Sequence, residues 1–228
     1  MSNPKILAVI PARGGSKRFP KKNLARLGNK TLLEYSIDFA MANSDLITKT
    51  VVSTDDNAIA EMAQEFGVET IRRPDDISGD HSPTSQAVKH ALSQVAGDFD
   101  LVLTLQPTNP LRPDGILENA IKILESGECD SVFTVQLSHR KLGYIEGERF
   151  RGLNYSFGQR SQDMRQAYYE TGLLYLTKSE LIEQGVIFGP KLKPMIVDHP
   201  FSEIDIDIEQ DLKKAEFYIK NYSDESTH

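Results

Sequence analysis

Near its N-terminus the chain reads Ile6-Leu-Ala-Val-Ile-Pro-Ala-Arg-Gly-Gly-Ser-Lys-Arg-Phe-Pro-Lys-Lys-Asn23, so an apolar run passes directly into a basic loop with two glycines. The first 33 residues hold eight of the chain's 26 basic residues and none of its 33 acidic residues, although the whole chain has a formal charge of −7. Cationic, glycine-containing loops after a first strand are where α/β proteins hold phosphate groups. A positive site on an acidic molecule points to a small anion as partner, and not to nucleic acid or a membrane.

Length and composition indicate an ordinary globular protein. The 228 residues are 39% hydrophobic and 26% charged, which suits one α/β domain over residues 1–228. The one cysteine, Cys129, excludes an intrachain disulfide framework and a cysteine-rich metal site. No apolar run approaches the roughly 18 residues that a membrane-spanning helix needs, and the first strand follows the N-terminus without a signal-peptide segment. We therefore expect a cytoplasmic enzyme.

Short apolar runs alternate with helical patterns up to residue 137. Strands are predicted at 5–11, 50–53, 68–72, 101–105 and 131–136. Helix ends are marked by a capping box at Thr31 and Glu34, by Asp56 before a helix over 57–66, and by Pro113 before a helix that ends ahead of Gly127. A further helix is predicted over 84–96. This alternation predicts a largely parallel sheet with right-handed crossovers.

The pattern breaks after Leu137. Residues 138–170 are polar, and Gly147 marks the turn of a hairpin-like piece over 143–150. We interpret 138–170 as an inserted arm, either a surface flap or a contact between subunits. The subunit contact is favoured because six apolar side chains need cover: Tyr144, Ile145, Phe150, Leu153, Tyr155 and Phe157. The α/β pattern then resumes with strands at 171–176 and 195–197 and helices at 179–184 and 209–222.

The basic loop matches neither of the common phosphate-binding fingerprints. Residues 14–20 lack the spacing of a P-loop and of G-x-G-x-x-G, so we do not expect a nicotinamide cofactor. Four cations lie within six residues (Lys17, Arg18, Lys21 and Lys22) and could neutralise a triphosphate and the charge on leaving pyrophosphate. The alternative is a solvated basic loop. Repulsion among these charges, with no acid nearby in the sequence, disfavours that alternative.

The segment Glu203-Ile-Asp-Ile-Asp-Ile208 alternates acidic and apolar residues. Such alternation predicts a strand with Asp205 and Asp207 on one face and the three isoleucines in the core. Carboxylates at positions i and i+2 can share a hard cation such as Mg²⁺. Two alternatives stay open: an acidic outer strand face, or Asp207 as the cap of the last helix in a capping box with Gln210.

Further polar segments follow three predicted strands. Leu105-Gln-Pro-Thr-Asn-Pro-Leu-Arg112 offers Gln106 to a ligand and the Arg112 fork to a carboxylate, although for this segment alone a double-proline turn with a helix start at Pro113 is the favoured interpretation. Asp55 could hold a ribose or a cation, or could cap a helix. Arg73 could bind a phosphate or a base, or belong to a solvated pair with Arg72.

Four motifs occur in order: Pro-Ala-Arg-Gly-Gly-Ser-Lys, Val-Ser-Thr-Asp, Leu-Gln-Pro-Thr-x-Pro-Leu-Arg and Ile-Asp-Ile-Asp. This set, from Ile10 to Asp207, resembles the CMP-sialic acid synthetases, cytidylyltransferases that activate N-acylneuraminate and related nine-carbon acid sugars (nonulosonates). The resemblance implies a Rossmann-like nucleotidyltransferase fold, with helices on both faces of a mostly parallel sheet. It also implies CTP and an acidic sugar as substrates, Mg²⁺ as cofactor, and a homodimer whose arm completes the partner's sugar site.

The resemblance also assigns site residues. The CTP positions of the family fall on Arg13, Ser16, Lys17, Lys22, Asn23, Arg73 and Thr84. The metal pair falls on Asp205 and Asp207, and the sugar contacts fall on Gln106 and, from the partner's arm, on Lys141 and Arg160. We assign catalytic roles to Arg13, Lys17, Lys22 and Asp207.

One departure concerns the sugar. Family members that use N-acetylneuraminate often carry Arg-Pro-Asn-Gly after the arm, where this chain has Tyr169-Glu-Thr-Gly172. The expected reaction joins CTP to a nonulosonate and releases pyrophosphate, with N-acetylneuraminate, legionaminate and pseudaminate all open. Two alternatives are a cytidylyltransferase for the eight-carbon 3-deoxy-octulosonate and a nucleotide-binding protein without turnover. The paired Asp205 and Asp207 speak against the second, because binding alone does not require them.

Overall fold

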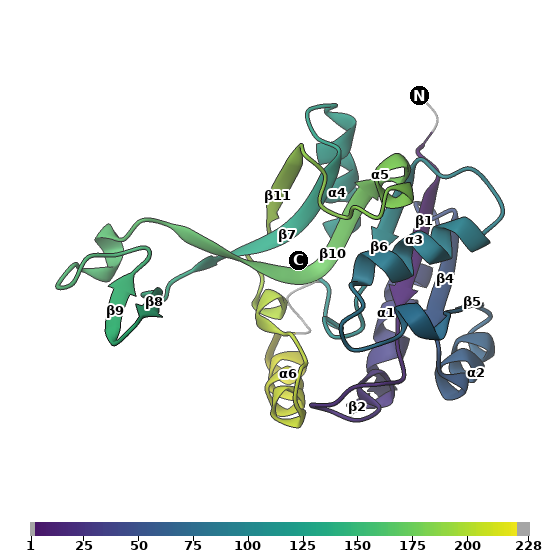
Figure 1. The fold of residues 1–228 in the computed structure, drawn as a ribbon, viewed down its shortest axis with the longest axis horizontal. Helices are drawn as coiled ribbons and strands as arrows, with labels where there is room; N and C mark the ends of the chain where they lie inside the picture. The colour runs from purple at the N-terminus through teal and green to yellow at the C-terminus, as the bar shows by residue number, and fades with distance from the viewer. Residues whose placement is uncertain (1–2, 223–228) are drawn as a thin grey trace.

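The computed structural model describes residues 3–222 and is built around one seven-stranded sheet (Figure 1). The strand order is β11-β7-β10-β6-β1-β4-β5, and within the described residues β10 is the one strand of this sheet that runs antiparallel to its neighbours. The strands are β1 (Ile6–Pro11), β4 (Lys49–Thr54), β5 (Glu69–Arg72), β6 (Leu101–Thr104), β7 (Ser131–Ser138), β10 (Ala167–Lys178) and β11 (Leu192–Ile196). The predicted mostly parallel α/β fold is confirmed.

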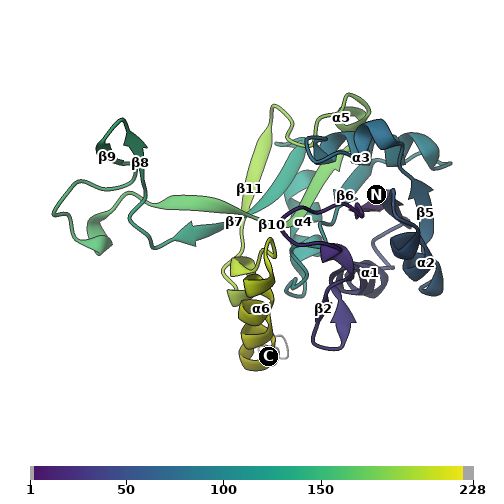
Figure 2. The ribbon, with the colours of Figure 1, turned by 60° about the horizontal axis from the view of Figure 1, so that its bottom comes forward.

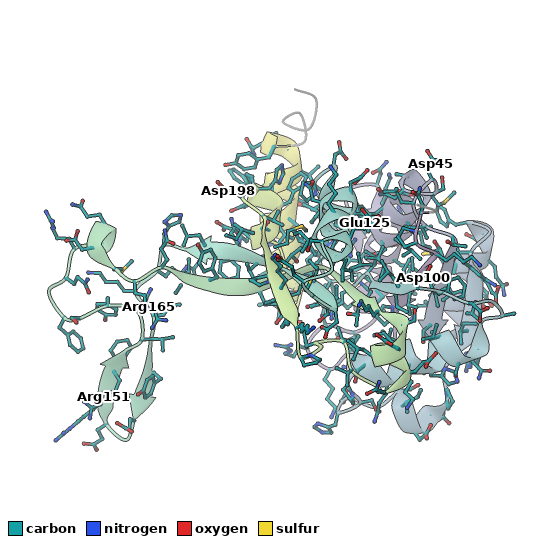
Figure 3. All side chains as sticks on the ribbon, turned by 90° about the horizontal axis from the view of Figure 1, so that it is seen from above. Asp45, Asp100, Glu125, Arg151, Arg165 and Asp198 are labelled. Atoms are coloured by element: carbon teal, nitrogen blue, oxygen red, sulfur yellow. The ribbon has the colours of Figure 1, made fainter. Side chains whose placement is uncertain are left out.

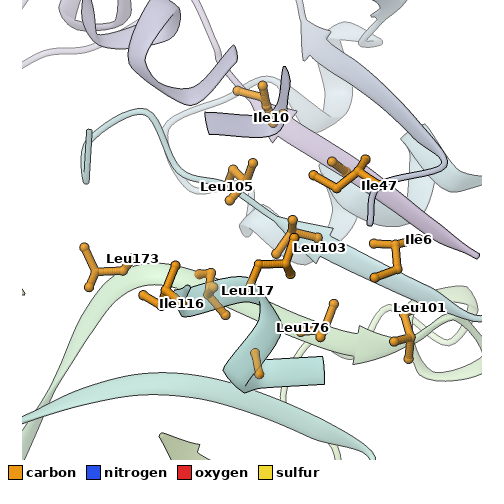
Figure 4. Packing of buried hydrophobic residues seen from close by; sticks show 14 of the residues in the cluster. Ile6, Ile10, Ile47, Leu101, Leu103, Leu105, Ile116, Leu117, Leu173 and Leu176 are labelled. Atoms are coloured by element: carbon orange, nitrogen blue, oxygen red, sulfur yellow. The ribbon is translucent and has the colours of Figure 1, made fainter. Parts of the chain in front are cut away.

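Helices cover both faces of the sheet. The helices α1 (Leu32–Ala42), α2 (Asn57–Glu65) and α4 (Ile116–Glu125) pack on one face, and α3 (Thr84–Gln94) and α5 (Ser179–Glu183) pack on the other. Alternate residues of β1 divide between the two cores, with Ile6 and Ile10 on the first face and Leu7 and Val9 on the second. Figure 4 shows the first core, where side chains of β1, β6, β10 and α4 interdigitate. Burial on both faces explains why these strands read as continuous apolar runs.

Smaller elements complete the fold. The hairpin β2 (Arg26–Leu27) and β3 (Lys30–Thr31) precedes α1, and α6 (Glu209–Tyr222) closes the described chain. Short 3₁₀ turns are η1 (Lys22–Leu24), η2 (Asp75–Ile77), η3 (Ser161–Asp163) and η4 (Pro200–Glu203). A third apolar cluster joins the hairpin and α1 to α6 through Leu27, Leu32, Ile204, Ile206 and Ala215.

Predicted side-chain caps mark the starts of α1 and α2. The capping box of Thr31 and Glu34 is confirmed, and the Asp56 carboxylate accepts the Ile59 N–H at 3.1 Å. The predicted start of α4 at Pro113 is wrong. That helix begins at Ile116, behind Gly115 in the left-handed conformation with φ 71°.

The predicted strand over residues 203–208 is also wrong. Its backbone bonds a loop instead, because the Ile206 N–H donates to the Thr108 carbonyl at 2.8 Å and the Asn109 amide donates to the Ile204 carbonyl at 3.2 Å. Ile204 and Ile206 are buried as predicted, whereas Ile208 is 39% exposed. The Asp207 capping box is wrong as well. Asp211 accepts the backbone N–H groups of Asp207 and Ile208 at 2.8 and 2.9 Å, so Asp211 is the carboxylate at the start of α6.

The segment between β7 and β10 forms an arm that projects from the body (Figures 1 and 2). Its tip carries the hairpin of β8 (Gly143–Glu146) and β9 (Arg149–Gly152), with Gly147 at φ 62° in the turn as predicted. Five of the six apolar side chains expected to need cover are exposed, namely Tyr144, Ile145, Phe150, Leu153 and Phe157, whereas Tyr155 is half-buried. Among the described residues, no helix is long and apolar enough to cross a membrane.

A substitution at Gly172 tests whether the hydrogen bonds of Asn109 to Thr171 and Ile204 stabilise the fold. It has φ 71°, and a Cβ there would lie 2.5 Å from Oδ1 of buried Asn109, which bonds Thr171 and Ile204. Gly172→Ala should lower the free energy of unfolding by about 3 kcal/mol, from left-handed strain plus displacement of Asn109. Gly127→Ala is the control, with φ 74° but open space around the Cβ, and should cost only about 1 kcal/mol. Equal losses in urea denaturation would show that the Asn109 contact is unimportant.

Candidate functional site

A cavity of about 710 Å³ opens at the carboxyl edge of the sheet, where the segments after β1, β5 and β6 meet. This is the edge at which doubly wound sheets bind ligands. Nine of the twelve site residues expected from the sequence line the cavity: Arg13, Ser16, Lys17, Lys22, Asn23, Arg73, Thr84, Gln106 and Asp207. Residues far apart in the chain therefore form one continuous, mainly basic wall.

The basic loop is held by neutral and acidic groups behind it. The Gly14 N–H donates to Asp55 at 2.9 Å, and the Asn23 side chain donates to the Arg13 carbonyl at 2.8 Å. A Cβ on Gly14 would lie 2.5 Å from Asp56 Oδ2, so only glycine fits there. Asp55 is therefore not the helix cap, since Asp56 caps α2, and it does not line the cavity but bonds the basic loop.

The backbone conformation gives the adjacent residues Lys21 and Lys22 different roles. Lys21 adopts a left-handed conformation with φ 56°, uncommon for a residue other than glycine, and η1 follows at once. This turn directs Lys22 inward, where its side chain is only 14% exposed and its ammonium lies 3.0 Å from Asp207 Oδ1. Backbone strain thus occurs where a cation has to be aimed into the cavity.

Two carboxylates distant in the sequence neutralise the basic loop. Asp207 pairs with Arg18 at 2.7 Å and with Lys22 at 3.0 Å, while Asp80 pairs with Arg13 at 3.2 Å and with Lys17 at 2.8 Å. The expectation that no acid balances this loop holds for the sequence neighbourhood but is wrong in three dimensions. Sequence reasoning missed Asp80, which precedes α3, because no local pattern signals an ion pair across more than 60 residues.

The metal-pair candidates differ electrostatically. Partial burial raises the pKa of Asp207, but the hydrogen bonds and charges of Lys22 and Arg18 outweigh it, so the pKa lies below its ordinary value. The pKa of Asp205 is raised, first by desolvation and then by the Asp207 charge, although the residue keeps an exposed surface. Asp205 does not line the cavity itself. The described residues contain no group of three or more His, Cys, Asp or Glu that could hold a metal, so this acidic pair stands without a third such residue.

Two arginines are buried, and both donate hydrogen bonds to backbone carbonyls. Buried Arg112 donates to the carbonyls of Leu173 and Gln106 at 2.6 and 2.8 Å, so its predicted role as a fork for a ligand carboxylate is wrong. Arg73 is buried and donates to the Ser53 carbonyl at 2.8 Å, so it is not a solvated residue. Burial lowers the pKa of Arg73, and Asp55 partly offsets this. Arg73 still lines the cavity, unlike Arg112.

The arm residues lie away from the cavity of their own chain. The Lys141 ammonium donates to the Gln159 carbonyl at 2.7 Å, and Arg160 pairs with Asp163 at 2.8 Å. Neither residue lines the cavity. Figure 3, which labels Arg151 and Arg165, shows the arm extending to one side of the body.

Fold and site together define an α/β protein with a basic cavity at the carboxyl edge of its sheet, of a kind that suits a nucleotide or another polyphosphate. A family model described as cytidylyltransferase matches residues 7–222, and the chain belongs to this family. The family resemblance inferred from the four sequence motifs is thereby confirmed.

Curated relatives carry related names. The chain is 30% identical over 95% of its length to the pseudaminic acid cytidylyltransferase of Campylobacter jejuni (strain 81-176), of which it covers 97%. It is 33% identical over 89% of its length to the CMP-N,N'-diacetyllegionaminic acid synthase of Legionella pneumophila, of which it covers 91%. It is 31% identical over 92% of its length to the N-acylneuraminate cytidylyltransferase of Escherichia coli O18:K1:H7, and it spans about half, 51%, of that protein.

Solved structures show the same fold. A CMP:2-keto-3-deoxy-manno-octonic acid synthetase complexed with CTP superposes with a TM-score of 0.70 at 16% identity, covering 95% of this chain and 98% of the other. The 4-diphosphocytidyl-2C-methyl-D-erythritol synthase of Anaerococcus prevotii superposes with a TM-score of 0.67 at 14% identity, covering 96% and 100%. At these identities the likeness supports the fold alone.

Asp207 and Asp211 form a matched pair of test positions. Asp207→Asn should cut turnover by more than about a hundredfold, because the charge facing the cavity is lost. Its stability should change by less than about 1 kcal/mol, since its ion pairs are partly exposed. Asp211→Ala removes the acceptor of the Asp207 and Ile208 N–H groups at the start of α6, so stability should fall by about 1 kcal/mol while turnover stays within about threefold. Turnover of Asp207→Asn above about a tenth of wild type would exclude the catalytic assignment.

Proposed function

We propose that the protein activates a nonulosonate with CTP, forming a CMP-sugar and pyrophosphate. The observation that carries this proposal is the 710 Å³ cavity, in which the cations of the basic loop face Asp207 and the Gln106 segment. The cytidylyltransferase family supports CTP as the nucleotide. The names of the pseudaminic, legionaminic and N-acylneuraminate relatives support a nine-carbon acid sugar as the acceptor.

In the proposed reaction the anomeric hydroxyl of the sugar attacks the α-phosphorus of CTP. A new P–O bond forms, the bond to the β-phosphate oxygen breaks, the hydroxyl proton is released, and pyrophosphate leaves. Arg13, Lys17 and Lys22 would stabilise the charge that grows on the leaving group. Ser16, Arg73 and Thr84 line the same cavity and would contact the nucleotide, and Asn23 would keep Arg13 in place. Positioning and electrostatics then supply the rate enhancement without a covalent enzyme intermediate.

The donor set of Asp205 and Asp207 fits a Mg²⁺ ion. Mg²⁺ prefers hard oxygen ligands and is bound by one or two carboxylates together with substrate phosphates. Desolvation raises the pKa of Asp205 most, and repulsion from Asp207 adds to it; a divalent cation would relieve that repulsion. Arg18, whose side chain is 69% exposed, could leave Asp207 at little cost. A bound Mg²⁺ would screen the triphosphate and polarise the phosphoryl oxygens.

The arm supports a homodimer as the working unit. Exposed apolar side chains at its tip form a surface of the kind that interfaces cover. Lys141 and Arg160 lie on this arm and outside the cavity of their own chain. They would then contact the acid sugar bound to the partner, where the Arg160 guanidinium can meet a carboxylate with two hydrogen bonds.

Substrate preference is tested by pyrophosphate release with Mg²⁺ and each of four nucleotides and four sugar acids. We expect CTP to exceed ATP, GTP and UTP, and one of pseudaminate, legionaminate or N-acetylneuraminate to exceed 3-deoxy-octulosonate. Removing Mg²⁺ with EDTA should abolish turnover, and adding Mg²⁺ should restore it. Faster turnover with the octulosonate would favour the eight-carbon sugar, and binding of CTP without turnover on any sugar would favour a nucleotide-binding protein.

Mixing two defective variants tests the shared sugar site. In a mixed dimer of Arg160→Ala and Asp207→Asn, one site carries both defects and the other carries neither. After subunit exchange, statistical mixing should return about a quarter of wild-type activity, because half of the dimers are mixed and half of their sites are intact.

The matched control mixes Asp207→Asn with Lys22→Ala. Both defects lie in the body of the chain, so every site of the mixed dimer keeps one of them, and activity should not exceed the mean of the parents. A monomer at micromolar concentration, or complete exchange without recovery, would show that the arm serves only its own chain.

A further inference from the structure

We propose that Asp80 is an internal counter-ion that competes with the triphosphate of the nucleotide, and with pyrophosphate, for Arg13 and Lys17. It thereby limits how tightly substrate and product are held. This inference rests on the proposed function, because it takes Arg13 and Lys17 as phosphate ligands.

Asp80 lies in the segment between β5 and α3, opposite the basic loop. Its two carboxylate oxygens are divided between Arg13 Nη1 at 3.2 Å and Lys17 Nζ at 2.8 Å. All three residues line the 710 Å³ cavity. The Lys17 side chain is 81% exposed, so the ion pair with Asp80 is what holds its ammonium group at the cavity wall. A phosphate group entering this corner of the cavity meets cations that already have an anionic partner.

Three basic residues act on the Asp80 carboxylate. The hydrogen bond from Lys17 lowers the pKa of Asp80, and the charges of Lys17, Arg13 and His81 lower it further, so the carboxylate is ionised at neutral pH. Asp207 is likewise paired with Lys22 and Arg18, but it also has Asp205 as an acidic neighbour, which suits it to a cation. The two carboxylates therefore have different environments, and Asp80 has that of an anion standing among phosphate-binding groups.

Asp80 is not needed to shape its own loop. The Ser78 hydroxyl donates to the Pro74 carbonyl at 2.7 Å, and the Ser82 N–H donates to the Gly79 carbonyl at 3.1 Å. Arg13 also donates to the Gly79 carbonyl at 2.8 Å, a contact that does not involve the Asp80 carboxylate. Removing the charge of Asp80 leaves these bonds in place, so its contribution is electrostatic.

Competition of this kind acts on both sides of the reaction. The triphosphate has to replace Asp80 as the partner of Arg13 and Lys17, which weakens nucleotide binding. Once the reaction is over, Asp80 can pair with the same side chains again, which favours departure of pyrophosphate. An enzyme without this carboxylate should bind CTP more tightly and be inhibited more strongly by its own product.

The test compares wild type with Asp80→Asn by titration calorimetry with CTP, and separately with inorganic pyrophosphate, at one fixed Mg²⁺ concentration. We expect each ligand to bind about two- to fivefold more tightly to the variant, the range expected when a partly exposed ion pair is removed. The inhibition constant for pyrophosphate should fall by a similar factor. In a Lys17→Gln background, the gain from Asp80→Asn should shrink, because one of the two contested cations is gone.

Asp75→Asn is the matched control. It removes the same formal charge five residues earlier, where the carboxylate makes no ion pair within residues 3–222. Unchanged or weaker ligand binding by Asp80→Asn overturns the inference, and weaker binding would make Asp80 a ligand in its own right. An equal gain in Asp75→Asn also overturns it, in favour of a general charge effect. If wild type binds CTP but Asp80→Asn changes nothing, only this inference fails, whereas a wild type that binds neither ligand refutes the proposed function itself.

Discussion

Crowding of like charge at one edge of the sheet is the constraint on which this molecule depends. Two unit charges about 4 Å apart repel by about 4 kcal/mol at an effective dielectric constant of 20. The basic loop places Arg13, Lys17, Arg18 and Lys22 around one cavity, so the fold has to supply anions there. Asp80 and Asp207 come from segments far along the chain, and each forms ion pairs with two basic side chains of the loop. Because these carboxylates neutralise part of the positive charge, the cavity can be stable without a ligand, and its remaining positive charge still attracts a polyphosphate.

A second set of contacts brings these carboxylates within reach. The segment 105–112 resembles a ligand-binding loop in sequence, but two of its polar side chains bond backbone carbonyls inside the protein. Arg112 bonds the carbonyls of Leu173 and Gln106, and Asn109 bonds those of Thr171 and Ile204. The Thr108 carbonyl accepts the N–H of Ile206. Residues 204–207 are therefore fastened to the end of β6, and Asp207 reaches the cavity from a loop instead of a strand.

Sequence reasoning succeeded at several positions where the decisive interaction is local, although the local signals at Pro113 and Asp207 misled it. The capping box at Thr31, the Asp56 cap and the extent of the last helix depend on residues within four positions of each other. It failed at residues 203–208, because alternation of acidic and apolar residues indicates which side chains are buried. It does not indicate whether the backbone hydrogen-bonds to a strand or to a loop. Ile204 and Ile206 are buried as a strand would bury them, yet their neighbour is a loop. Asp80 was missed for a different reason, because its partners lie more than 60 residues earlier in the chain.

The arm combines a base that is paired within the main sheet with a tip that forms a separate hairpin. Its base continues the main sheet, with Ala167 opposite Ser138 and Tyr169 opposite Gln136. These pairs align the base of the arm with the main sheet. Its tip is a two-stranded hairpin, which is marginal on its own, and ring contacts such as Phe150 with Phe157 at 6.2 Å give it only partial cover. In the proposed homodimer, a second molecule would cover this apolar tip, which points away from its own body.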